Sequence, residues 1–484
     1  MDMDIIVFGA GKTGKNAIPF LESHYHILFY VDNDEKKWGS VLGIYKVKSP
    51  DEIKEYDCAV VSVLTGYNFG LEVVEQLEQM KVKHERIYFC RRLGSTSQFE
   101  IYPLKKTLIQ YDLCHAEERR TDCKKVLIFC RGCSVYAKQL IENMAKRYDD
   151  IEFSLLTCKE ENKDQIVSER LKHIYYFRTM LDLRTILEQL PMYDAMQLLW
   201  MEKEWVYFHK LIRSKTKRLN LIVGGSDFYR AGKTERDEKR KLIECADWIN
   251  GQTEETVKEF KLYYNDVAAD KLCCFLYGRE VLDYINLNKE PDKNKLKRKH
   301  HIPLNKIVVT CGHNANQAHQ HAEIIDALNY LPVKIKRQIV CVFPMTYPQG
   351  SDEYINFVDN SLKQTDIQYV ILKDFMDFQG MAEYALISDI MIHVQTTDLM
   401  SSSMMEEMYA GSIVIAGSWL PYKSLRKMGI YFLDVDTISD VTAVLEDVIV
   451  NLETYKDKCK GNRALIWQYS SWDEVAPKWH ALWE

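Results

Sequence analysis

Hydrophobic and polar positions divide the chain into short apolar runs separated by stretches with helical spacing. Residues 5–8 form the first run, and a glycine-rich turn and a helical pattern to about Glu22 follow it. Further runs of β-branched and aromatic residues cover residues 27–31 and 59–63. Such runs predict buried strands, and strands that alternate with helices predict a parallel sheet. Residues 1–92 are therefore expected to form an α/β domain.

The turn after the first run has the pattern Gly-x-Gly-x-x-Gly at Gly9, Gly11 and Gly14, and the second run ends at Asp32. This order of strand, glycine turn, helix, strand and acid is the Rossmann dinucleotide fingerprint in its expected context. The glycines allow close approach to a phosphate, and the helix N-terminus attracts it. A nucleotide or nucleotide-sugar ligand is the favoured interpretation, with NAD-dependent redox chemistry or a scaffold role as alternatives. No Tyr-x-x-x-Lys pair lies in this domain, which argues against hydride chemistry.

The pattern weakens over residues 93–122, which we expect to be a linker, and restarts at Lys124. Residues 123–300 are expected to form a second α/β domain, with a helix over residues 135–146. Its predicted strands are residues 126–130, 151–156, 174–177, 195–199 and 219–223. The basic stretch at residues 288–301 is interpreted as an interdomain linker rather than a nucleic-acid patch, because charge runs are usually solvated.

A third α/β domain is expected over residues 301–455. Its predicted strands are residues 307–310, 339–343, 369–372, 390–394, 413–416 and 430–433. The tail, residues 456–484, carries four tryptophans: Trp467, Trp472, Trp479 and Trp483. Large aromatic side chains need a surface to cover, so we expect a helical tail that packs on a neighbouring domain.

Composition narrows the class of protein. The chain has 64 Lys and Arg against 70 Asp and Glu, a net charge of -6, so nothing favours nucleic acid as a partner. Its 13 cysteines show no framework spacing, and no signal peptide is visible, which together predict reduced thiols in the cytoplasm. No apolar run approaches about 18 residues, so no membrane span is expected.

The most informative stretch is residues 393–416, which reads as strand, polar loop, helix and strand. Serines at residues 401–403 are expected to start the helix, and Gly411 to end it. Serines at a helix start leave backbone N–H groups available to an anion. Asp398 in the loop and Glu406 in the helix are carboxylates that can bind sugar or ribose hydroxyls.

This stretch resembles the donor-binding segment of GT-B glycosyltransferases, in which two acidic residues flank seven others ahead of a glycine and a strand. Asp398 stands where that family has glutamate, and Glu406 is the second acid. The Gly-Phe-Gly that usually follows the first acid is replaced by residues 399–403.

A closer resemblance covers residues 124–484. Residues 309–321, 342–348 and 352–354, and the Gly-Gly-Ser-Asp-Phe-Tyr segment at residues 224–229, are similar to segments of the 4-acetamido-4,6-dideoxygalactose (Fuc4NAc) transferase family. Members of that family use a dTDP-sugar and a lipid-linked acceptor to build surface polysaccharide.

These resemblances imply an α/β chain with two facing Rossmann-like domains, the GT-B arrangement, behind the additional N-terminal Rossmann-like domain. Residues 123–300 would be the acceptor domain and residues 301–455 the donor domain. The expected activity is metal-independent transfer of a hexose-type sugar from a dTDP- or UDP-linked donor, with no required cofactor. A lipid-linked acceptor would bring the enzyme to the inner face of the plasma membrane as a peripheral protein. Homo-oligomer formation stays open.

The resemblance implies a set of donor contacts in three loops. They are Asn314, Gln317 and His319, then Tyr347, then Thr397, Asp398, Ser402, Ser403 and Glu406. The first loop has no Arg or Lys, where many GT-B enzymes place a cation for the leaving diphosphate. His319, His321 or helix dipoles are expected to replace it.

Asp227 is the candidate general base, because it follows a buried strand on the acceptor side. An inverting transfer needs such a base to deprotonate the acceptor hydroxyl, whereas a retaining transfer does not. The alternative interpretation is an aspartate that caps the next helix.

Three other patterns each allow a functional and a structural interpretation. His313, His319 and His321 have no neighbouring carboxylate before Glu323, so a metal site is not expected. The Cys-x-x-Cys at residues 130–133 is interpreted as a glycine turn rather than a redox site. Residues 419–422 either line the sugar site or form a rigid turn, and the sequence favours neither.

Overall fold

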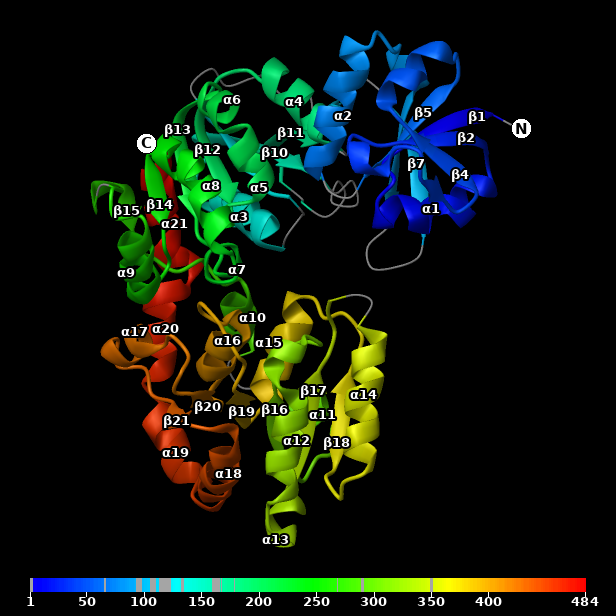
Figure 1. Ribbon diagram of the computed structural model, residues 1–484. Coiled ribbons are helices and arrows are strands. Elements are labelled where there is room, and N and C mark those ends of the chain that lie inside the picture. The colour runs from blue at the N-terminus through cyan, green and yellow to red at the C-terminus, as the bar shows by residue number, and fades with distance from the viewer. Residues whose placement is uncertain are drawn as a thin grey trace. The chain divides into compact units, whose positions relative to one another are not determined.

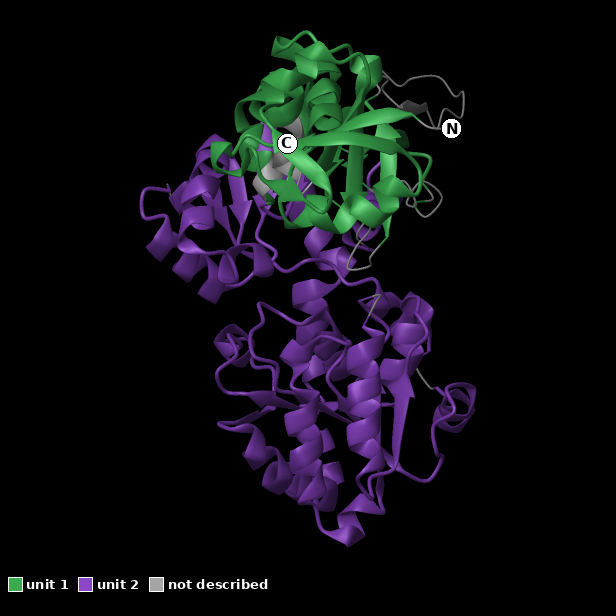
Figure 2. Cartoon of the chain, turned by 45° about the vertical axis from the view of Figure 1, so that its right-hand side comes forward, with its two compact units in different colours: residues 1–134, 152–196, 202–217 green, residues 135–151, 197–201, 218–484 purple. Residues whose placement is uncertain are grey.

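The computed structural model describes residues 3–64, 67–92, 98–104, 110–112, 123–131, 135–158, 166, 168–177, 179–267, 269–288, 291–348 and 351–484. The chain divides into two compact units (Figure 2). The first unit contains residues 1–134, 152–196 and 202–217, and the second contains residues 135–151, 197–201 and 218–484. None of the helices among these described residues is long and apolar enough to cross a bilayer.

The first unit begins with a seven-stranded sheet, drawn in blue in Figure 1. In spatial order its strands are β3 (Val41–Leu42), β4 (Tyr45–Lys48), β2 (His26–Val31), β1 (Asp4–Phe8), β5 (Ala59–Leu64), β6 (Ile87–Arg92) and β7 (Phe99–Pro103). Its helices are α1 (Lys12–Glu22) and α2 (Tyr67–Gln79). Strands β2, β1, β5 and β6 run parallel, as the alternation of strands and helices predicts.

Close packing between the glycine loop and α1 explains the third glycine of the fingerprint. A Cβ atom on Gly14 would lie 2.0 Å from the backbone oxygen of Gly9, so only glycine fits there. Gly9 itself has φ +112°, whereas a Cβ on Gly11 would meet nothing within 4 Å. The pattern therefore has a packing role in addition to any contact with a ligand.

The segment expected to be a linker, residues 93–122, instead contains two strands among its described residues. Strand β7 extends the first sheet antiparallel to β6, and β8 (Gln110–Asp112) pairs antiparallel with β11 (Leu171–Tyr176). Both are short edge strands, which carry little of the apolar signal by which buried strands are found.

The middle of the chain contributes strands to both units. The first unit holds β8, β9 (Lys124–Phe129), β11 and most of β10 (Ile151–Thr157). The second holds β14 (Trp248–Asn250) and β15 (Leu272–Cys273), which continue in parallel from β13. The boundary between the units falls inside β12 (Tyr193–Leu199) and β13 (Thr216–Ile222).

The helices of this middle region follow its strands along the chain. They are α3 (Val135–Arg147), α4 (Met180–Gln189), α5 (Lys203–Tyr207), α6 (His209–Arg213), α7 (Ser226–Tyr229), α8 (Lys233–Cys245), α9 (Glu254–Tyr263), α10 (Val281–Leu287) and α11 (Lys293–Lys299). Helix α11 occupies half of the basic stretch expected to be a linker. Its last residue, Lys299, is paired with the carboxylate of Glu383.

A parallel six-stranded sheet forms the centre of the second unit's C-terminal half, labelled β16 to β21 in Figure 1. In spatial order its strands are β18 (Tyr369–Leu372), β17 (Ile339–Pro344), β16 (Ile307–Cys311), β19 (Ile390–His393), β20 (Ile413–Gly417) and β21 (Leu433–Val435). In order of appearance this is 3-2-1-4-5-6, so the strand order reverses between β16 and β19. Five of the six predicted strands lie within one or two residues of those observed. The last begins at Leu433 rather than Ile430, because pairing with β20 starts there.

The remaining helices cover this sheet and end the chain. They are α12 (His321–Asn329), α13 (Val333–Lys336), α14 (Asp352–Lys363), α15 (Phe378–Ile387), α16 (Ser402–Ala410), α17 (Lys423–Lys427), α18 (Val441–Val450), α19 (Leu452–Cys459), α20 (Asn462–Ser470) and α21 (Trp472–Trp483). Strand residues such as Val309 and Ile392 are fully buried between them, as expected of a parallel sheet covered on both faces. Helix α21 packs against α3, and the amide of Asn220 donates to the carbonyl of Leu482 at 3.0 Å.

Candidate functional site

The loops that follow β16 and β19 meet where the strand order of the third sheet reverses. Open α/β sheets bind ligands at the carboxyl ends of their strands at such a point, because the flanking connections leave in opposite directions there. The loop after β16 begins at Gly312, and the backbone N–H of Thr396, after β19, donates to the carbonyl of Ala318 at 2.9 Å. The two loops are therefore fixed to each other.

Helix α16 begins and ends as its sequence predicts. Ser401 caps the helix, and its hydroxyl accepts a hydrogen bond from the N–H of Met404 at 3.2 Å. Gly411 ends it with φ 101°. The backbone N–H groups of the first turn, which starts at Ser402, thus lie beside the loop after β19.

Asp398, in this loop, is held by two partners. The hydroxyl of Tyr422 donates to its carboxylate, and Nε2 of His393 lies 3.6 Å from the same oxygen. Burial raises the pKa of Asp398, but the interaction with His393 and the hydrogen bond from Tyr422 outweigh burial and hold it below the usual range. Asp398 is therefore an ionised carboxylate, and its Oδ2 is already bound to protein groups.

Glu406 lies one turn further into α16 and is 6% exposed. Burial raises the pKa of Glu406 to about 7, although the positive charge of Arg279 acts in the opposite direction. Arg279, on the segment between β15 and α10, also faces Asp398 and donates from Nη1 to the hydroxyl of Ser402. The two predicted acids and a buried cation thus converge at the start of α16.

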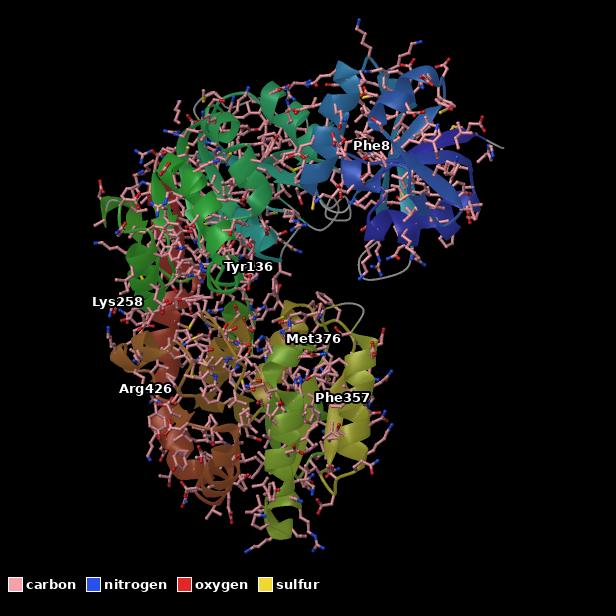
Figure 3. All side chains as sticks on the ribbon, viewed as in Figure 1. Phe8, Tyr136, Lys258, Phe357, Met376 and Arg426 are labelled. Atoms are coloured by element: carbon pink, nitrogen blue, oxygen red, sulfur yellow. The ribbon has the colours of Figure 1, made fainter. Side chains whose placement is uncertain are left out.

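Two tyrosines face the same charges. Tyr136 opens α3 (Figure 3), and both Arg279 and Tyr347 interact electrostatically with it. Tyr347 also interacts with Glu406 and Asp398, and removal of water from its hydroxyl raises its pKa to about 12 although the side chain is partly exposed. The middle region of the chain and the third sheet therefore both contribute to the site within the second unit.

The other predicted donor contacts lie in the same loops with different exposure. Asn314 hydrogen-bonds Tyr347, and its side-chain oxygen accepts from the N–H of Asn316 at 2.8 Å. Gln317 and Thr397 are exposed, and Ser403 is half-buried in the first turn of α16. These three side chains lie in the loops and the helix of the site, and their contacts with a ligand stay predictions.

The histidines of the first loop form a cluster rather than separate contacts. The ring centroids of His313 and His319 are 4.2 Å apart, and His393 stacks on His313 at 5.7 Å. Burial lowers the pKa of His313 to about 3 and that of His321 to about 4, and it holds the pKa of His319 far below its usual value. At neutral pH these imidazoles are uncharged, so in this state they do not supply the cation expected of His319 or His321.

Asp227 lies in α7 and is bound to backbone amides. Its carboxylate oxygens accept hydrogen bonds from the N–H of Met201 at 2.9 Å and from the N–H of Gly224 at 2.9 and 3.1 Å. Burial raises the pKa of Asp227, and these hydrogen bonds act against burial. The side chain thus fixes two loops to each other, and its role as a base stays a prediction.

Trp200, directly before Met201, has a left-handed backbone with φ 70°, which is rare for so large a side chain. A Cβ on Gly224 would lie 1.4 Å from Cδ1 of Trp200, so the indole packs directly on the glycine backbone. The ring of Tyr136 meets Trp200 edge-on at 5.2 Å. Asp227 therefore holds an aromatic pair beside the site.

In the first domain, Asp32 is engaged by the glycine loop. Its Oδ2 accepts from the N–H of Ala10 at 2.7 Å and lies 3.0 Å from Nζ of Lys37. Burial raises the pKa of Asp32, but hydrogen bonds from Asp34, Lys37 and Ala10 hold it below the usual range. Gly9, Gly11 and Gly14 surround the start of α1, as the fingerprint predicts.

Sequence reasoning missed Arg279, Tyr136, His393 and Tyr422. An Arg-Glu pair that follows the apolar residues 275–277 after a single glycine was a signal for Arg279. Tyr422 belongs to the stretch 419–422. Trp419 of this stretch is 40% exposed, so the alternative of a rigid turn with a buried tryptophan is wrong, and a role in lining the sugar site stays a prediction. Tyr422 binds Asp398, and Nε1 of Trp419 donates to the carbonyl of Gln395 at 2.8 Å. Residues 132–134 of the Cys-x-x-Cys turn lie outside the described residues.

Residues 1–88 match the family described as C2185-like, N-terminal. No curated protein matches the chain. The fold is shared with solved structures of low sequence identity. HepE of Anabaena, in complex with UDP and glucose, is 13% identical with a TM-score of 0.59 over 74% of this chain and 98% of that chain.

Two further structures agree with this match. Sucrose-phosphate synthase of Thermosynechococcus elongatus is 14% identical, with a TM-score of 0.59 over 74% of this chain and 98% of that chain. A glycosyltransferase of Rickettsia africae is 13% identical, with a TM-score of 0.60 over 75% of this chain and 98% of that chain. The predicted fold class is confirmed: the chain is an α/β protein with the GT-B fold of glycosyltransferases.

Proposed function

We propose that this chain is a glycosyltransferase that moves a sugar from a nucleotide-sugar donor to a glycan or lipid-linked glycan acceptor. The observation that carries the proposal is the convergence of Asp398, Glu406 and Arg279 where the strand order of the third sheet reverses. Carboxylates suit the hydroxyls of ribose and sugar, and a helix N-terminus beside a cation suits phosphate. The fold shared with HepE, whose structure holds UDP and glucose, supports a nucleotide-linked donor.

In such a transfer the bond between the anomeric carbon and the β-phosphate oxygen breaks, and its electron pair leaves with the nucleoside diphosphate. The acceptor hydroxyl oxygen bonds to the anomeric carbon, and its proton passes to a base or to the leaving phosphate. Asp398 and Glu406 would bind donor hydroxyls, and Tyr347 and Asn314 would border the base or sugar. Asp227 would serve as the base if the transfer inverts the anomeric centre.

Finer features of the proposal rest on the resemblance to the Fuc4NAc transferase family. That resemblance favours a dTDP- or UDP-linked hexose derivative, a lipid-linked acceptor, surface polysaccharide synthesis and peripheral contact with the inner membrane face. We also propose that transfer needs no divalent metal, which a transfer assay in EDTA tests directly. Loss of turnover in EDTA, with recovery on added Mg²⁺, would remove this feature and leave the rest of the proposal in place.

For the first domain we propose a nucleotide or nucleotide-sugar ligand at the loop formed by Gly9, Gly11 and Gly14. The free N-terminus of α1 and the reversal of strand order beside β1 support this proposal. Oδ1 of Asp32 accepts from the N–H of Asp34 at 2.9 Å and, within the part of the chain that the structure describes, from no other group, so it is a further acceptor for a ribose hydroxyl.

The experiment is a thermal-stability panel on the full chain with UDP, dTDP, GDP, NAD and the corresponding nucleotide-sugars. A ligand that binds only the folded state at 100 times its Kd stabilises it by about 2.7 kcal/mol. We expect a stabilisation by UDP or dTDP that Glu406→Gln abolishes and that Glu323→Gln, on the exposed face of α12, leaves unchanged.

The opposite result has a clear meaning. A stabilisation that survives Glu406→Gln but disappears in Asp32→Asn would assign the nucleotide to the first domain. Stabilisation by NAD alone would overturn the transferase proposal and favour redox chemistry in that domain.

A further inference from the structure

Arg279 is a buried cation with few partners of its own. The residue is 6% exposed, and burial lowers its pKa although Glu406 and Asp398 act in the opposite direction. Taking a guanidinium out of water is costly unless its donors are satisfied. The groups around Arg279 should therefore show why a charge is buried there.

The hydrogen bonds of this guanidinium are incomplete. It carries five N–H donors, and among the described residues only the hydroxyl of Ser402 accepts from one of them. Its Nε is buried without a hydrogen-bond partner. The one donor that is used, Nη1, reaches the hydroxyl of Ser402, the first residue of α16, so the guanidinium lies at the start of this helix.

The start of α16 adds a second group of unused donors. Ser401 accepts from the N–H of Met404, and among the described residues no side chain caps the earlier N–H groups of the first turn. A helix N-terminus carries a partial positive charge, and here a full positive charge lies beside it. Backbone donors, a serine hydroxyl and a guanidinium in one place are the chemistry of a phosphate site.

Arg279 is also held rigidly. Its backbone N–H donates to the carbonyl of Ser470 at 2.9 Å. A Cβ on the preceding Gly278 would lie 2.3 Å from the indole of Trp472, and the following Glu280 accepts from Nδ2 of Asn143 at 3.2 Å. The last helices of the chain and α3 therefore fix the cation from both sides, so it needs no rearrangement to meet a ligand.

We propose that Arg279, together with Ser402 and the first turn of α16, binds the diphosphate of the nucleotide donor. This inference rests on the proposed transferase function and names the residue that neutralises its leaving group. The loop after β16 has no Lys or Arg between Gly312 and Gln320, and its histidines are uncharged. Arg279 takes the place of that missing cation from a segment outside the third sheet.

The test is calorimetric titration of the full chain with a nucleoside, its monophosphate and its diphosphate, in the uridine and the thymidine series. Arg279→Met, Arg279→Lys and Ser402→Ala are compared with the wild type. Arg426→Met is the matched control, because Arg426 (labelled in Figure 3) is a half-exposed arginine of α17 paired with Asp434. Unfolding midpoints without ligand show whether each variant is folded.

Losing a hydrogen-bonded charge should weaken binding of the diphosphate about 10- to 100-fold in Arg279→Met and leave the nucleoside unchanged. Arg279→Lys should recover part of that loss, Ser402→Ala should lose several-fold, and Arg426→Met should match the wild type. If Arg279→Met does not fold, the lysine and alanine variants still decide the question.

Two results would contradict the inference in different ways. Unchanged diphosphate affinity in folded Arg279 and Ser402 variants would overturn the role of Arg279 while the transferase proposal stands. Equal affinity of the wild type for nucleoside and diphosphate would overturn the diphosphate site itself. If the wild type binds none of the six compounds, the proposed function fails and this inference fails with it.

Discussion

The hydroxyl of Tyr422 donates a hydrogen bond to the carboxylate of Asp398 and lies 2.8 Å from Nε2 of His393. The tyrosine thus bridges the acid of the loop after β19 to the last residue of that strand. Neither partner is a sequence neighbour of Tyr422, so the bridge exists only in the folded chain.

Tyr422→Phe removes one of the hydrogen bonds that lower the pKa of Asp398. The pKa should therefore rise, and donor binding that needs the carboxylate should be lost at a higher pH on the acid side. Near neutral pH the carboxylate stays ionised, so we expect donor binding there to change little. Titrations of the protein with donor from pH 4 to pH 8 measure the shift in the pH at which binding is lost. Tyr369→Phe removes a similar bond, from Tyr369 to Asp359 at 2.9 Å, outside the site and should leave the profile unchanged.

Asp227→Asn should destabilise the protein. An asparagine replaces one of the two carboxylate oxygens by an NH2 group, which cannot accept. With its oxygen in the place of Oδ2 the side chain still accepts from Met201, but the NH2 then faces the N–H of Gly224, at a cost of about 1–3 kcal/mol. Denaturant unfolding measures this loss, with Asp247→Asn, another acceptor of a backbone N–H, for comparison. If Asp227 is also the base, transfer to the acceptor should fall far more than donor binding. If transfer and donor binding both fall slightly and to the same extent, Asp227 has a structural role alone.

Gly225→Ala should destabilise the contact between the residue 224–227 turn and the loop after β19. Gly225 has φ +96°, and its added Cβ would lie 2.8 Å from Cβ of Leu399. Backbone strain and overlap together should lower the free energy of unfolding by about 1–3 kcal/mol. Adding Leu399→Ala should recover only the part due to overlap. Gly232→Ala, where a Cβ meets nothing within 4 Å, should change little.

Glu407→Gln should change how stability depends on pH. Glu407 is buried, accepts from Ser412 at 2.7 Å and from Thr310 at 3.3 Å, and burial raises its pKa to about 8. Above the ordinary pKa of glutamate the unfolded chain releases this proton while the folded chain keeps it. The free energy of unfolding therefore falls as pH rises, until pH passes about 8.

Between pH 6.5 and 8 this one group should contribute a fall of about 1–2 kcal/mol. The depressed pKa values of His313 and His321 act below that window, where they make stability rise with pH. Glu407→Gln should flatten the fall in denaturant titrations across this range. An unchanged slope would mean that Glu407 titrates normally.

The third sheet was predictable because most of its strands are buried on both faces. Ile307 to Cys311 and Ile413 to Gly417 are continuous apolar runs bounded by turns, and the serine and glycine that bound α16 have local chemical reasons. Strand β7 was not predicted because an edge strand needs only one buried face, and four of its five residues are partly or fully exposed.

The site was predictable only where its residues lie close together in the sequence. Asp398 and Glu406 share one loop and helix, so their spacing alone places them together. Arg279 and Ser402 are separated by 123 positions, and no local pattern connects them. Only the topology that returns the last helices to the middle of the chain brings the cation to the start of α16.

That return has a consequence for synthesis on the ribosome. Ser470, whose carbonyl holds the backbone of Arg279, and Trp472, which packs on Gly278, are translated after every strand of the three sheets. A nascent chain can complete the three sheets while its guanidinium still lacks this support. Competence to hold an anion would then arise only after residues 470–472 have been translated and the sheets have formed.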